Sequence, residues 1–572
     1  MPGFAVLLAI VLSAGGVLAM TAGAADPNEG SVSLEQVKTG WNGKQYASGM
    51  TSLPEANTVK AACTVPGDEL CDHFDLNVDI DQSHWESSNG GVQVQIAWES
   101  ESDDFDLYVF DAAGNAVGSS ASAGTSSERV FIDDASGEYQ VRVVPWDVTD
   151  SGYAGGAWVE SRAQVGGDVP QEPLSNTHCR EGLAGPFPCK NVKLQSFMPL
   201  STIGGGNLND IWGWTDPKTG REYALVGKTS GTAFVDITSP TAPVYLGDLP
   251  SHQPVETIFN TWRDIKVYEN RAFIGSEEPG HGLQVFDLTR LRGASGPKTW
   301  TEDTHYSFNL DGPGSIDPVG NLGNVGQGDN SHNIAINEDS GFLYAIGTST
   351  CGGGGPHMVD IRDPEEPTFA GCVSEDGYTH DTQCVNYEGP DGRFAGQEIC
   401  FNSNEDTVTI VDVTDKENPQ QLSRTGYETA AYTHQGWLTP DQRYLIVDDE
   451  LDEQEQGGQT KSYIFDVAKL DAPVLIGVYN GVAESIDHNM YTKGNRVFQA
   501  NYRSGLRILD TSRVSEGSLR EVGFFDVYPP DDEAEFNGAW SNYPYFESGN
   551  VVVSGIEQGL FVVKPQGRAR PR

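Results

Sequence analysis

Four of the 11 histidines in this 572-residue chain occupy one position of a repeated sequence pattern. The repeats align on segments that begin NDIWGW, RDIKVY, HNIAIN, HDTQCV, HQGWLT, HNMYTK and NGAWSN. The aligned position holds Asn209, Arg263, His332, His380, His434, His488 and Asn537. Because neutral imidazole is a good ligand for zinc, copper, nickel and iron, the four histidines predict a transition-metal site where the repeats meet.

The position that follows is also polar in most repeats. It holds Asp210, Asp264, Asn333, Asp381, Gln435, Asn489 and Gly538. We expect Asp264 and Asp381 to bind the metal or to orient the histidines, and a metal with an open position to polarise a substrate or activate water. The alternative is a structural ring that hydrogen-bonds internally, to backbone and to trapped water, in which Arg263 would repel a cation. Asn209, Arg263 and Asn537 are candidate ligand-binding residues.

A second repeated motif indicates which elements position these residues. It reads FVDIT (234–238), VFDLT (285–289), MVDIR (358–362), IVDVT (410–414), IFDVA (464–468), ILDTS (508–512) and FVVKP (561–565). Each copy follows an apolar strand and a turn, and each unit has four predicted strands. Four-stranded units at intervals of about 50 residues are typical of β-propeller blades. Since the first strand of a blade lines the central channel, the aligned residues would form a ring around the axis.

The last unit lacks a fourth strand, and the segment NVKLQSFMPL (191–200) is its predicted replacement. Pairing of this segment with residues 558–564 would close the ring and leave no free sheet edge. The sequence therefore predicts an all-β protein with a seven-bladed β-propeller over residues 191–566, closed by an N-terminal strand, and a tail over 567–572. The VD-type motif resembles that of LVIVD-repeat propellers, and the chain resembles the choice-of-anchor B family. This resemblance implies a secreted or cell-surface protein without an agreed activity.

Loops predicted on the same face as the histidines offer further ligands. His281 and His357 lie in two of these loops and are additional candidate ligand-binding residues. A third loop carries the acidic residues Asp448, Asp449, Glu450, Asp452 and Glu453. Carboxylate oxygens are preferred ligands of calcium, so this run is a candidate calcium site. The alternative is a charged loop that is simply solvated.

Residues 61–165 alternate apolar and polar side chains in short runs such as VQVQIAWES and GEYQVRVVPW. This pattern predicts a small antiparallel β-sandwich. The segments CDHFDLNV, DDFDLYVFDAAGNAV and GEYQVRV resemble the bacterial pre-peptidase C-terminal domain. The resemblance implies a non-catalytic appendage that attaches a secreted protein to a surface or polymer. Asp103, Asp104 and Asp106 could hold calcium there, or form a solvated acidic turn.

Charge and the N-terminal residues limit the class of protein. A net charge of -47 repels phosphate backbones and anionic lipids, which excludes nucleic-acid binding and membrane binding through charge. Residues 5–19 form an apolar run too short to span a bilayer, and Ala22 and Ala24 supply a small-x-small cleavage pattern. We predict a signal peptide over residues 1–25, cut near Ala24 or Ala25. After cleavage, no integral membrane segment would remain, and the protein would be extracellular or on the cell surface.

The eight cysteines fall into four local pairs without a CxxC motif, which disfavours zinc-ribbon and thioredoxin-type chemistry. In an exported chain, such cysteines predict disulfides. The nearest-neighbour pairs, one of about a hundred possible connectivities, are Cys63–Cys71, Cys179–Cys189, Cys351–Cys372 and Cys384–Cys400. The remaining segments are predicted to be a linker over residues 26–60 and a disulfide-stapled linker over 166–190.

No GxSxG, HExxH, P-loop or Rossmann fingerprint stands in the sequence context that it requires. The leading hypothesis is a secreted or cell-surface binding or scaffold protein. Its propeller face, rich in histidines and carboxylates, would bind an extracellular polymer or a protein ligand. The alternative hypothesis is an extracellular metalloenzyme with the histidine ring as its metal site. A stoichiometric transition metal that is lost on histidine replacement would distinguish the two hypotheses.

Overall fold

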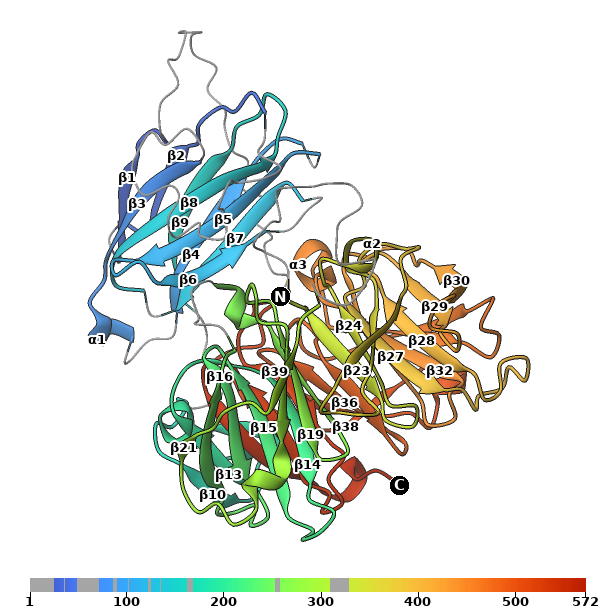
Figure 1. The fold of residues 1–572 in the computed structure, drawn as a ribbon. Coiled ribbons are helices and arrows are strands. Elements are labelled where there is room, and N and C mark those ends of the chain that lie inside the picture. The colour runs from blue at the N-terminus through green and yellow to red at the C-terminus, as the bar shows by residue number, and fades with distance from the viewer. Residues whose placement is uncertain are drawn as a thin grey trace. The chain divides into compact units, whose positions relative to one another are not determined.

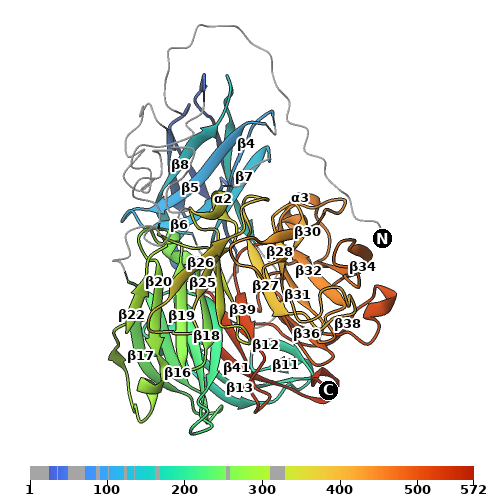
Figure 2. The same ribbon diagram turned by 45° about the vertical axis from the view of Figure 1, so that its right-hand side comes forward.

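The computed structural model describes residues 25–34, 36–48, 71–85, 90–100, 102–121, 125–133, 135–161, 168–252, 258–308 and 329–572. Within these residues the protein is all-β, with short strands in several sheets (Figures 1 and 2). The chain divides between Ser161 and Arg162 into two compact units.

Helices are few and short in the described residues. The α-helices are α1 (Gln82–Trp85), α2 (Cys351–Gly354) and α3 (Asp452–Gln456). The 3-10 helices are η1 (Leu200–Ile203), η2 (Ile258–Thr261), η3 (Leu288–Leu291), η5 (Val514–Glu516) and η6 (Gly567–Ala569). None of the helices in the described part of the chain is both long and apolar enough to cross a membrane.

The first unit consists of two sheets that share one hydrophobic core. One sheet has the strand order β1 (Glu29–Ser33), β3 (Asp72–Asp79), β8 (Gly137–Asp147), β5 (Asp104–Asp111) and β6 (Ala116–Ser120). The other has the order β2 (Lys38–Asn42), β9 (Ala154–Ser161), β4 (Gly90–Ala97) and β7 (Ser127–Asp133). Alternate residues of β4, such as Val92, Val94 and Ile96, are buried in this core, as the period of two in a strand requires.

The expectation of a linker over residues 26–60 is wrong for its first half. β1 pairs parallel with β3, and β2 pairs antiparallel with β9, so the unit is also not wholly antiparallel. Trp41 in β2 is buried and stacks on Phe74, with ring centroids 3.9 Å apart. This stretch folds into the unit because it supplies apolar side chains to the core, despite its polar composition.

The described strands of the second unit form seven sheets. The first four are β14 (Leu208–Thr215), β15 (Glu222–Lys228), β16 (Gly231–Asp236), β17 (Val244–Pro250) with edge strand β21 (Lys298–Thr299); β18 (Arg263–Tyr268), β19 (Arg271–Ser276), β20 (Leu283–Asp287), β22 (Thr304–Tyr306); β23 (Asn333–Asn337), β24 (Phe342–Ile346), β25 (His357–Asp360), β26 (Thr368–Cys372); and β27 (Asp381–Asn386), β28 (Glu398–Ser403), β29 (Val408–Asp412), β30 (Gln420–Thr425).

The last three sheets follow the same order, with additional strands from residues 174–199. They are β31 (Thr433–Leu438), β32 (Tyr444–Asp449), β33 (Lys461–Asp466), β34 (Val474–Asn480); β35 (Met490–Lys493), β36 (Arg496–Asn501), β37 (Gly505–Asp510), β38 (Arg520–Phe525) with β12 (Phe187–Lys190) and β11 (Leu183–Ala184); and β39 (Ala539–Tyr543), β40 (Val551–Gly555), β41 (Gly559–Pro565), β13 (Val192–Pro199) with β10 (Leu174–Thr177). In all seven sheets, the first strand contacts the first strand of the next sheet, and β39 contacts β14.

The last sheet combines strands from distant parts of the sequence. β13 pairs antiparallel with β41, with Val192 opposite Pro565 and Pro199 opposite Gly559. The prediction of a linker over residues 166–190 is corrected, because β10 pairs with β13 and β12 pairs with β38. The tail over residues 567–572 is also packed: Ala569 is buried, and the backbone N–H of Arg572 donates to Asn495 (2.9 Å).

The repeated VD-type motif lies on the third strand of its sheets, and its aspartate has a structural role. Each aspartate ends its strand and accepts a hydrogen bond from the backbone N–H two residues later, at 2.9–3.0 Å. The six residues are Asp236, Asp287, Asp360, Asp412, Asp466 and Asp510. Short acidic side chains commonly make this local bond, which turns the chain out of the strand.

Three of the predicted disulfides are present: Cys179–Cys189, Cys351–Cys372 and Cys384–Cys400. Cys71 is also disulfide-bonded, whereas Cys63 lies outside the described residues. The second and third disulfides lie in adjacent sheets of the second unit and join neighbouring segments of the chain.

Candidate metal centre

The four histidines of the repeat lie side by side. His332, His380, His434 and His488 stand at or just before the first strands β23, β27, β31 and β35. Their ring centroids are separated by 4.3, 4.3 and 4.4 Å along the series. Successive first strands contact one another, so residues at the same position of each repeat become neighbours. The four histidines are therefore adjacent because they share one repeat position.

Each of the four rings directs Nδ1 toward an oxygen acceptor. The acceptors are Glu277 Oε1 for His332 (2.5 Å), His434 O for His380 (2.9 Å), Asp448 Oδ1 for His434 (3.2 Å) and Trp540 O for His488 (2.5 Å). A carbonyl or carboxylate oxygen accepts a hydrogen bond, so Nδ1 carries the proton and Nε2 of a neutral ring carries the lone pair. This arrangement of an oriented imidazole is usual among metal-binding histidines.

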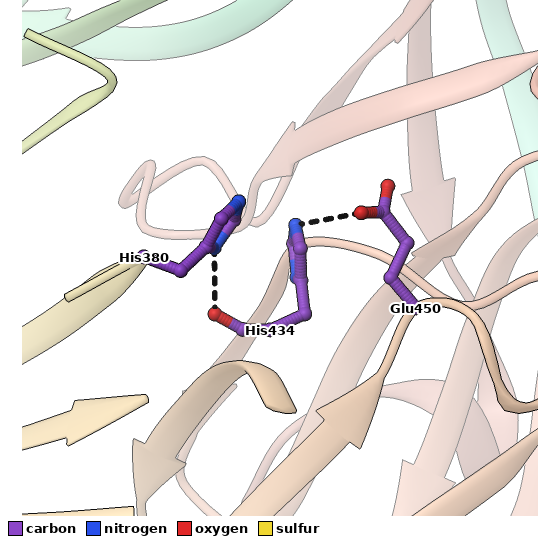
Figure 3. Close-up of side chains that lie close together, drawn as sticks. All are labelled: His380, His434 and Glu450. Carbon is purple, nitrogen blue, oxygen red and sulfur yellow. Dashed lines mark hydrogen bonds and ion pairs between the residues drawn. The ribbon is translucent and has the colours of Figure 1, made fainter. Parts of the chain in front are cut away.

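Glu450 supplies a carboxylate on the Nε2 side of two of the rings. Its oxygens lie 3.8 Å from His434 Nε2 and 3.5 Å from His488 Nε2, and the Tyr502 hydroxyl donates to it at 2.8 Å. His380, His434 and Glu450 each offer one ligand atom, and these atoms lie within 4.8 Å of one another (Figure 3). This is the one such group of three or more among the described residues.

Burial determines the charge state of the site. Burial lowers the pKa of His380 and His434 well below the usual value, and neighbouring imidazoles add to the effect. Burial also lowers the pKa of His488 to about 3 and raises the pKa of Glu450 to about 7. Burial alone would lower the pKa of His332, but the Glu277 carboxylate outweighs it and raises that pKa. At neutral pH, three of the imidazoles are therefore neutral, as metal binding requires.

Aromatic side chains surround the imidazoles. Tyr432 packs edge-on against His380, with centroids 5.1 Å apart, and Trp540 packs edge-on against His488 at 5.2 Å. Tyr502 lies 4.9 Å from His488. These rings limit the rotation of the histidines and give the site a partly apolar lining, which strengthens electrostatic interactions within it.

The structure corrects the expectation that Asp264 and Asp381 serve the metal. Asp264 accepts from the backbone N–H of Ile334 at 2.7 Å and forms an ion pair with Lys266. Asp381 accepts from the side-chain amide of Gln435 at 2.9 Å. These contacts join the first strands of neighbouring sheets, and neither carboxylate belongs to the group formed by His380, His434 and Glu450.

Four of the candidate ligand-binding residues are buried and are used within the protein. Arg263 is 1% exposed, and its guanidinium donates to His281 Nε2 at 2.9 Å. The Asn209 amide donates to the carbonyl of Thr261 (2.8 Å). His357 lies between Thr350 and Tyr306, 2.9 Å from each hydroxyl. The fifth, Asn537, accepts from the guanidinium of the buried Arg503. This corrects the ligand-binding assignment, because their polar groups stabilise the fold.

The predicted acidic run does not act as one unit. Glu450 faces the histidines, and Asp448 contacts His434. Asp449 accepts from the Tyr427 hydroxyl at 2.7 Å and from the backbone of residues 431 and 432. In the first unit, Asp103, Asp104 and Asp106 form no group of three close ligand atoms within the described residues. Asp103 accepts instead from the backbone N–H of Thr149 at 3.0 Å.

The repeat pattern did not reveal Glu277, and the acidic run predicted a calcium site at Glu450 in place of a contact with the histidines. Both residues directly follow the second strand of a sheet, β19 or β32, and Tyr502 follows β36 in the same way. An alignment on the second strand of each repeat would have found this position. The two Tyr-Thr-His segments that contain His380 and His434 are a further signal, since they place Tyr378 and Tyr432 two residues before each histidine.

Comparison with known proteins identifies part of the first unit. A model of the bacterial pre-peptidase C-terminal domain matches residues 84–145. This match and the disulfides are compatible with an extracellular protein. No curated protein is similar enough to match the chain.

Two solved structures of low identity are similar in part. A crystal structure of a protein from Lactobacillus plantarum is 14% identical, with 60% of this chain and 88% of that chain covered and a TM-score of 0.39. A functionally unknown protein from Desulfotomaculum acetoxidans is 10% identical, with coverage of 60% and 90% and a TM-score of 0.39.

Proposed function

We propose that the second unit is a seven-bladed β-propeller that binds a divalent transition-metal ion on its axis, in a secreted or cell-surface protein. Support for the propeller comes from seven consecutive sheets whose first strands contact one another in cyclic order. The pairing of β13 with β41 supports closure of the last blade. The VD-type motif on the third strands supports the resemblance to LVIVD-repeat propellers of the choice-of-anchor B family.

The convergence of His380, His434 and Glu450 within 4.8 Å carries the metal proposal. Two imidazoles and a carboxylate form a ligand set that zinc uses in hydrolytic enzymes. The Nδ1 atoms of both histidines are held by oxygen acceptors, so Nε2 of each ring is the atom that would bind the metal. Binding would replace the contact of His380 Nε2 with His332 Nε2. His332 and His488 flank the group. The neutral His488 is available as a further ligand, and His332 is a hydrogen-bond partner for a bound substrate.

Metal-dependent catalysis is the activity that this arrangement supports best. Three protein ligands leave a coordination position at which a metal can polarise a substrate oxygen or activate water. The chain as a whole is strongly acidic, with a net charge of -47. Because such a charge repels anions, we expect a neutral or cationic substrate in place of a polyanion.

The match to the pre-peptidase C-terminal domain favours a second function, in the first unit. A non-catalytic domain of this kind supports attachment to an extracellular polymer, a protein ligand or a surface. A binding or scaffold role of the whole chain becomes the leading hypothesis if the second unit holds no metal. The two roles are compatible, since they belong to different units.

Metal analysis of the purified protein tests the proposal. The protein is produced without an affinity tag, treated with a chelator, reloaded separately with zinc, copper and nickel, and analysed by mass spectrometry. We expect about one tightly bound ion per chain, as for a mononuclear site. A double variant with His380→Ala and His434→Ala should lose it, and Glu450→Gln should bind it at least about tenfold more weakly.

His178→Ala is the matched control, because His178 is exposed and distant in sequence from the repeat position. This variant should keep the metal. Near-ultraviolet circular dichroism shows whether each variant retains the native packing. Absence of metal from the reloaded wild type, or equal metal content in the folded double variant, would overturn the proposal and leave the histidines a structural ring.

A further inference from the structure

A second group of carboxylates lies where two neighbouring sheets meet. Asp448 is the second-last residue of β32, Asp452 and Glu453 lie in the first turn of α3, and Asp487 lies in the segment before β35. We call these four residues the carboxylate cluster. Asp487 is 0% exposed, and neither of its carboxylate oxygens has a hydrogen-bond partner among the described residues.

The other three residues each have one satisfied oxygen and one orphaned oxygen. One oxygen of Asp452 accepts from Lys461 Nζ at 2.9 Å and from the Tyr463 hydroxyl at 2.7 Å, while Oδ1 has no partner. Glu453 accepts from the backbone N–H of Lys461 at 3.1 Å, while Oε2 has no partner. Oδ1 of Asp448 accepts from the backbone N–H of Gln435 in β31 at 2.7 Å, while Oδ2 has no partner. Five buried carboxylate oxygens are therefore unsatisfied.

Buried carboxylates without partners need a compensating charge. Among the described residues, Lys461 is the one lysine or arginine that forms an ion pair with the carboxylate cluster. Its ammonium group lies 2.9 Å from Asp452 Oδ2. Burial raises the pKa of Asp487 well above its usual value, and repulsion from Glu453, Asp448 and Asp452 adds to that rise. Shared protons or a bound cation are the two ways to relieve this repulsion.

We propose that the carboxylate cluster binds a calcium ion through the orphaned oxygens of Asp487, Asp452, Glu453 and Asp448. The donors are all oxygen, which favours a hard cation over the metals that prefer imidazole or thiolate. Calcium takes roughly six to eight oxygen ligands in irregular geometries, so waters complete its coordination. No three of the four carboxylates yet offer oxygens within 4.8 Å of one another in the described structure, so the ion draws them together on binding.

A cation at this position would also order the neighbouring histidine site. Glu450 belongs to the same loop as Asp452, and His488 directly follows Asp487. The ion links that loop of one sheet to the entry strand of the next, and so fixes the position of both residues. This consequence rests on the proposed metal centre, whereas calcium binding itself does not.

Calcium binding to the chelator-treated full chain tests the proposal. It is followed by isothermal titration, by thermal melting with and without millimolar calcium chloride, and by luminescence of terbium sensitised by Tyr463. We expect wild-type protein to bind calcium and to melt at a higher temperature with it. Asp487→Asn should bind calcium at least about tenfold more weakly. Without calcium it should melt no lower than the wild type, because it removes an uncompensated buried carboxyl group.

Glu455→Gln is the matched control, since Glu455 is an exposed residue of the same short helix. It should bind calcium as the wild type does. A wild-type melting temperature insensitive to calcium, or unchanged affinity in Asp487→Asn, overturns the proposal in favour of shared protons. The His380→Ala, His434→Ala double variant separates the two sites: retained calcium binding in that variant supports a distinct calcium site whatever the transition-metal result, and its loss overturns the independence of the carboxylate cluster.

Discussion

The Nε2 atoms of His332 and His380 lie 2.7 Å apart. Both rings place Nδ1 against an oxygen acceptor, the Glu277 carboxylate for His332 and the His434 carbonyl for His380. Both rings therefore carry a proton on Nδ1. Two Nε2 lone pairs would repel each other at this distance, so one Nε2 is also protonated and donates to the other. The positive charge belongs to His332, because the Glu277 carboxylate outweighs burial and raises the pKa of that ring.

The metal-free protein at neutral pH should contain one imidazolium among the four axial histidines, and it should be His332. Glu277→Gln should lower the pKa of His332 and so reduce this charge at the same pH. The variant removes the largest contribution that opposes burial, and Glu450 and Asp381 oppose burial less strongly. Side-chain nitrogen shifts of protein labelled with ¹⁵N-histidine distinguish the three protonation states. A neutral His332 in the wild type, or an unchanged spectrum in the variant, would contradict the assignment.

Asp264→Asn should weaken the fold without emptying the metal centre. The change removes the ion-pair partner of the buried Lys266 in the same strand. It also alters the acceptor of the Ile334 backbone N–H, which links β18 to β23. Breaking a buried pair in this way costs about 3 kcal/mol or more. Urea denaturation measures the loss, and metal content per folded chain should stay at the wild-type value. Glu417→Gln, on an exposed turn, is the control. Loss of metal from folded Asp264→Asn would restore Asp264 as a ligand.

Asp106 in β5 predicts a pH dependence of the first unit. Burial raises its pKa to about 8, and Asp104 and Glu128 add to the rise against the hydrogen bond from Tyr108. The folded state therefore holds a proton that the unfolded state releases above about pH 4, so the free energy of unfolding falls as pH rises from about 4 to 8. Asp106→Asn should abolish this fall and be more stable than the wild type at pH 8 by about 5 kcal/mol, given a pKa raised from 3.8 to about 8.

Hydrogen exchange of peptides from β5 and β8 measures this local stability in the full chain. The variant and the wild type should exchange at similar rates near pH 4 after correction for the intrinsic rate. Glu138→Gln, an exposed residue of β8, should follow the wild type at every pH. Equal pH dependence in Asp106→Asn and the wild type would show that Asp106 is already ionised at neutral pH.

Ala25 gives a prediction about processing. Its backbone nitrogen is buried and lies 2.8 Å from Asp72 Oδ1, while Asp72 Oδ2 accepts from the Tyr153 hydroxyl at 3.0 Å. Cleavage after Ala24 would convert that nitrogen into an α-ammonium group that pairs with the carboxylate. Intact mass and N-terminal sequencing of exported protein should therefore give Ala25 as the first residue. Cleavage after Ala25 would be the contrary result.

The same contact predicts a stability effect in the processed protein. Asp72→Asn should lower its free energy of unfolding by about 2–3 kcal/mol, because a charged hydrogen-bond partner of a buried group is lost. Asp79→Asn, at an exposed position of β3, should have little effect. Urea denaturation of both variants checks this, and equal stability of Asp72→Asn and the wild type would contradict it.

The repeat pattern predicted the strands of the second unit well, because each repeat contains the apolar runs and turn residues that determine its own strands. The VD-type motif marks a third strand through its aspartate, and the histidines mark the entry to a first strand. Alternation of apolar residues likewise predicted most strands of the first unit. The two short strands within residues 29–42 were not predicted, because each contains only one large apolar residue, Val32 or Trp41. The strands with which they pair, β3 and β9, lie further along the chain.

The site was predicted only in part, because ligand convergence depends on side-chain direction. Asp264 and Asp381 are adjacent in sequence to Arg263 and His380, but successive residues of a strand point to opposite faces. They consequently contact Lys266 and Gln435. Glu277 approaches His332 from a different sheet, which no spacing within one repeat can reveal.

The pairing of β13 with β41 has a consequence for biogenesis. β13 emerges from the ribosome long before β41, so its sheet remains incomplete until almost all of the second unit has been synthesised. Before that point, both β13 and β40 present unpaired strand edges, which are templates for aggregation and sites of proteolytic attack. A chain interrupted before residue 559 would therefore keep both edges exposed, whereas β41 of a full-length chain covers both of them in one final step.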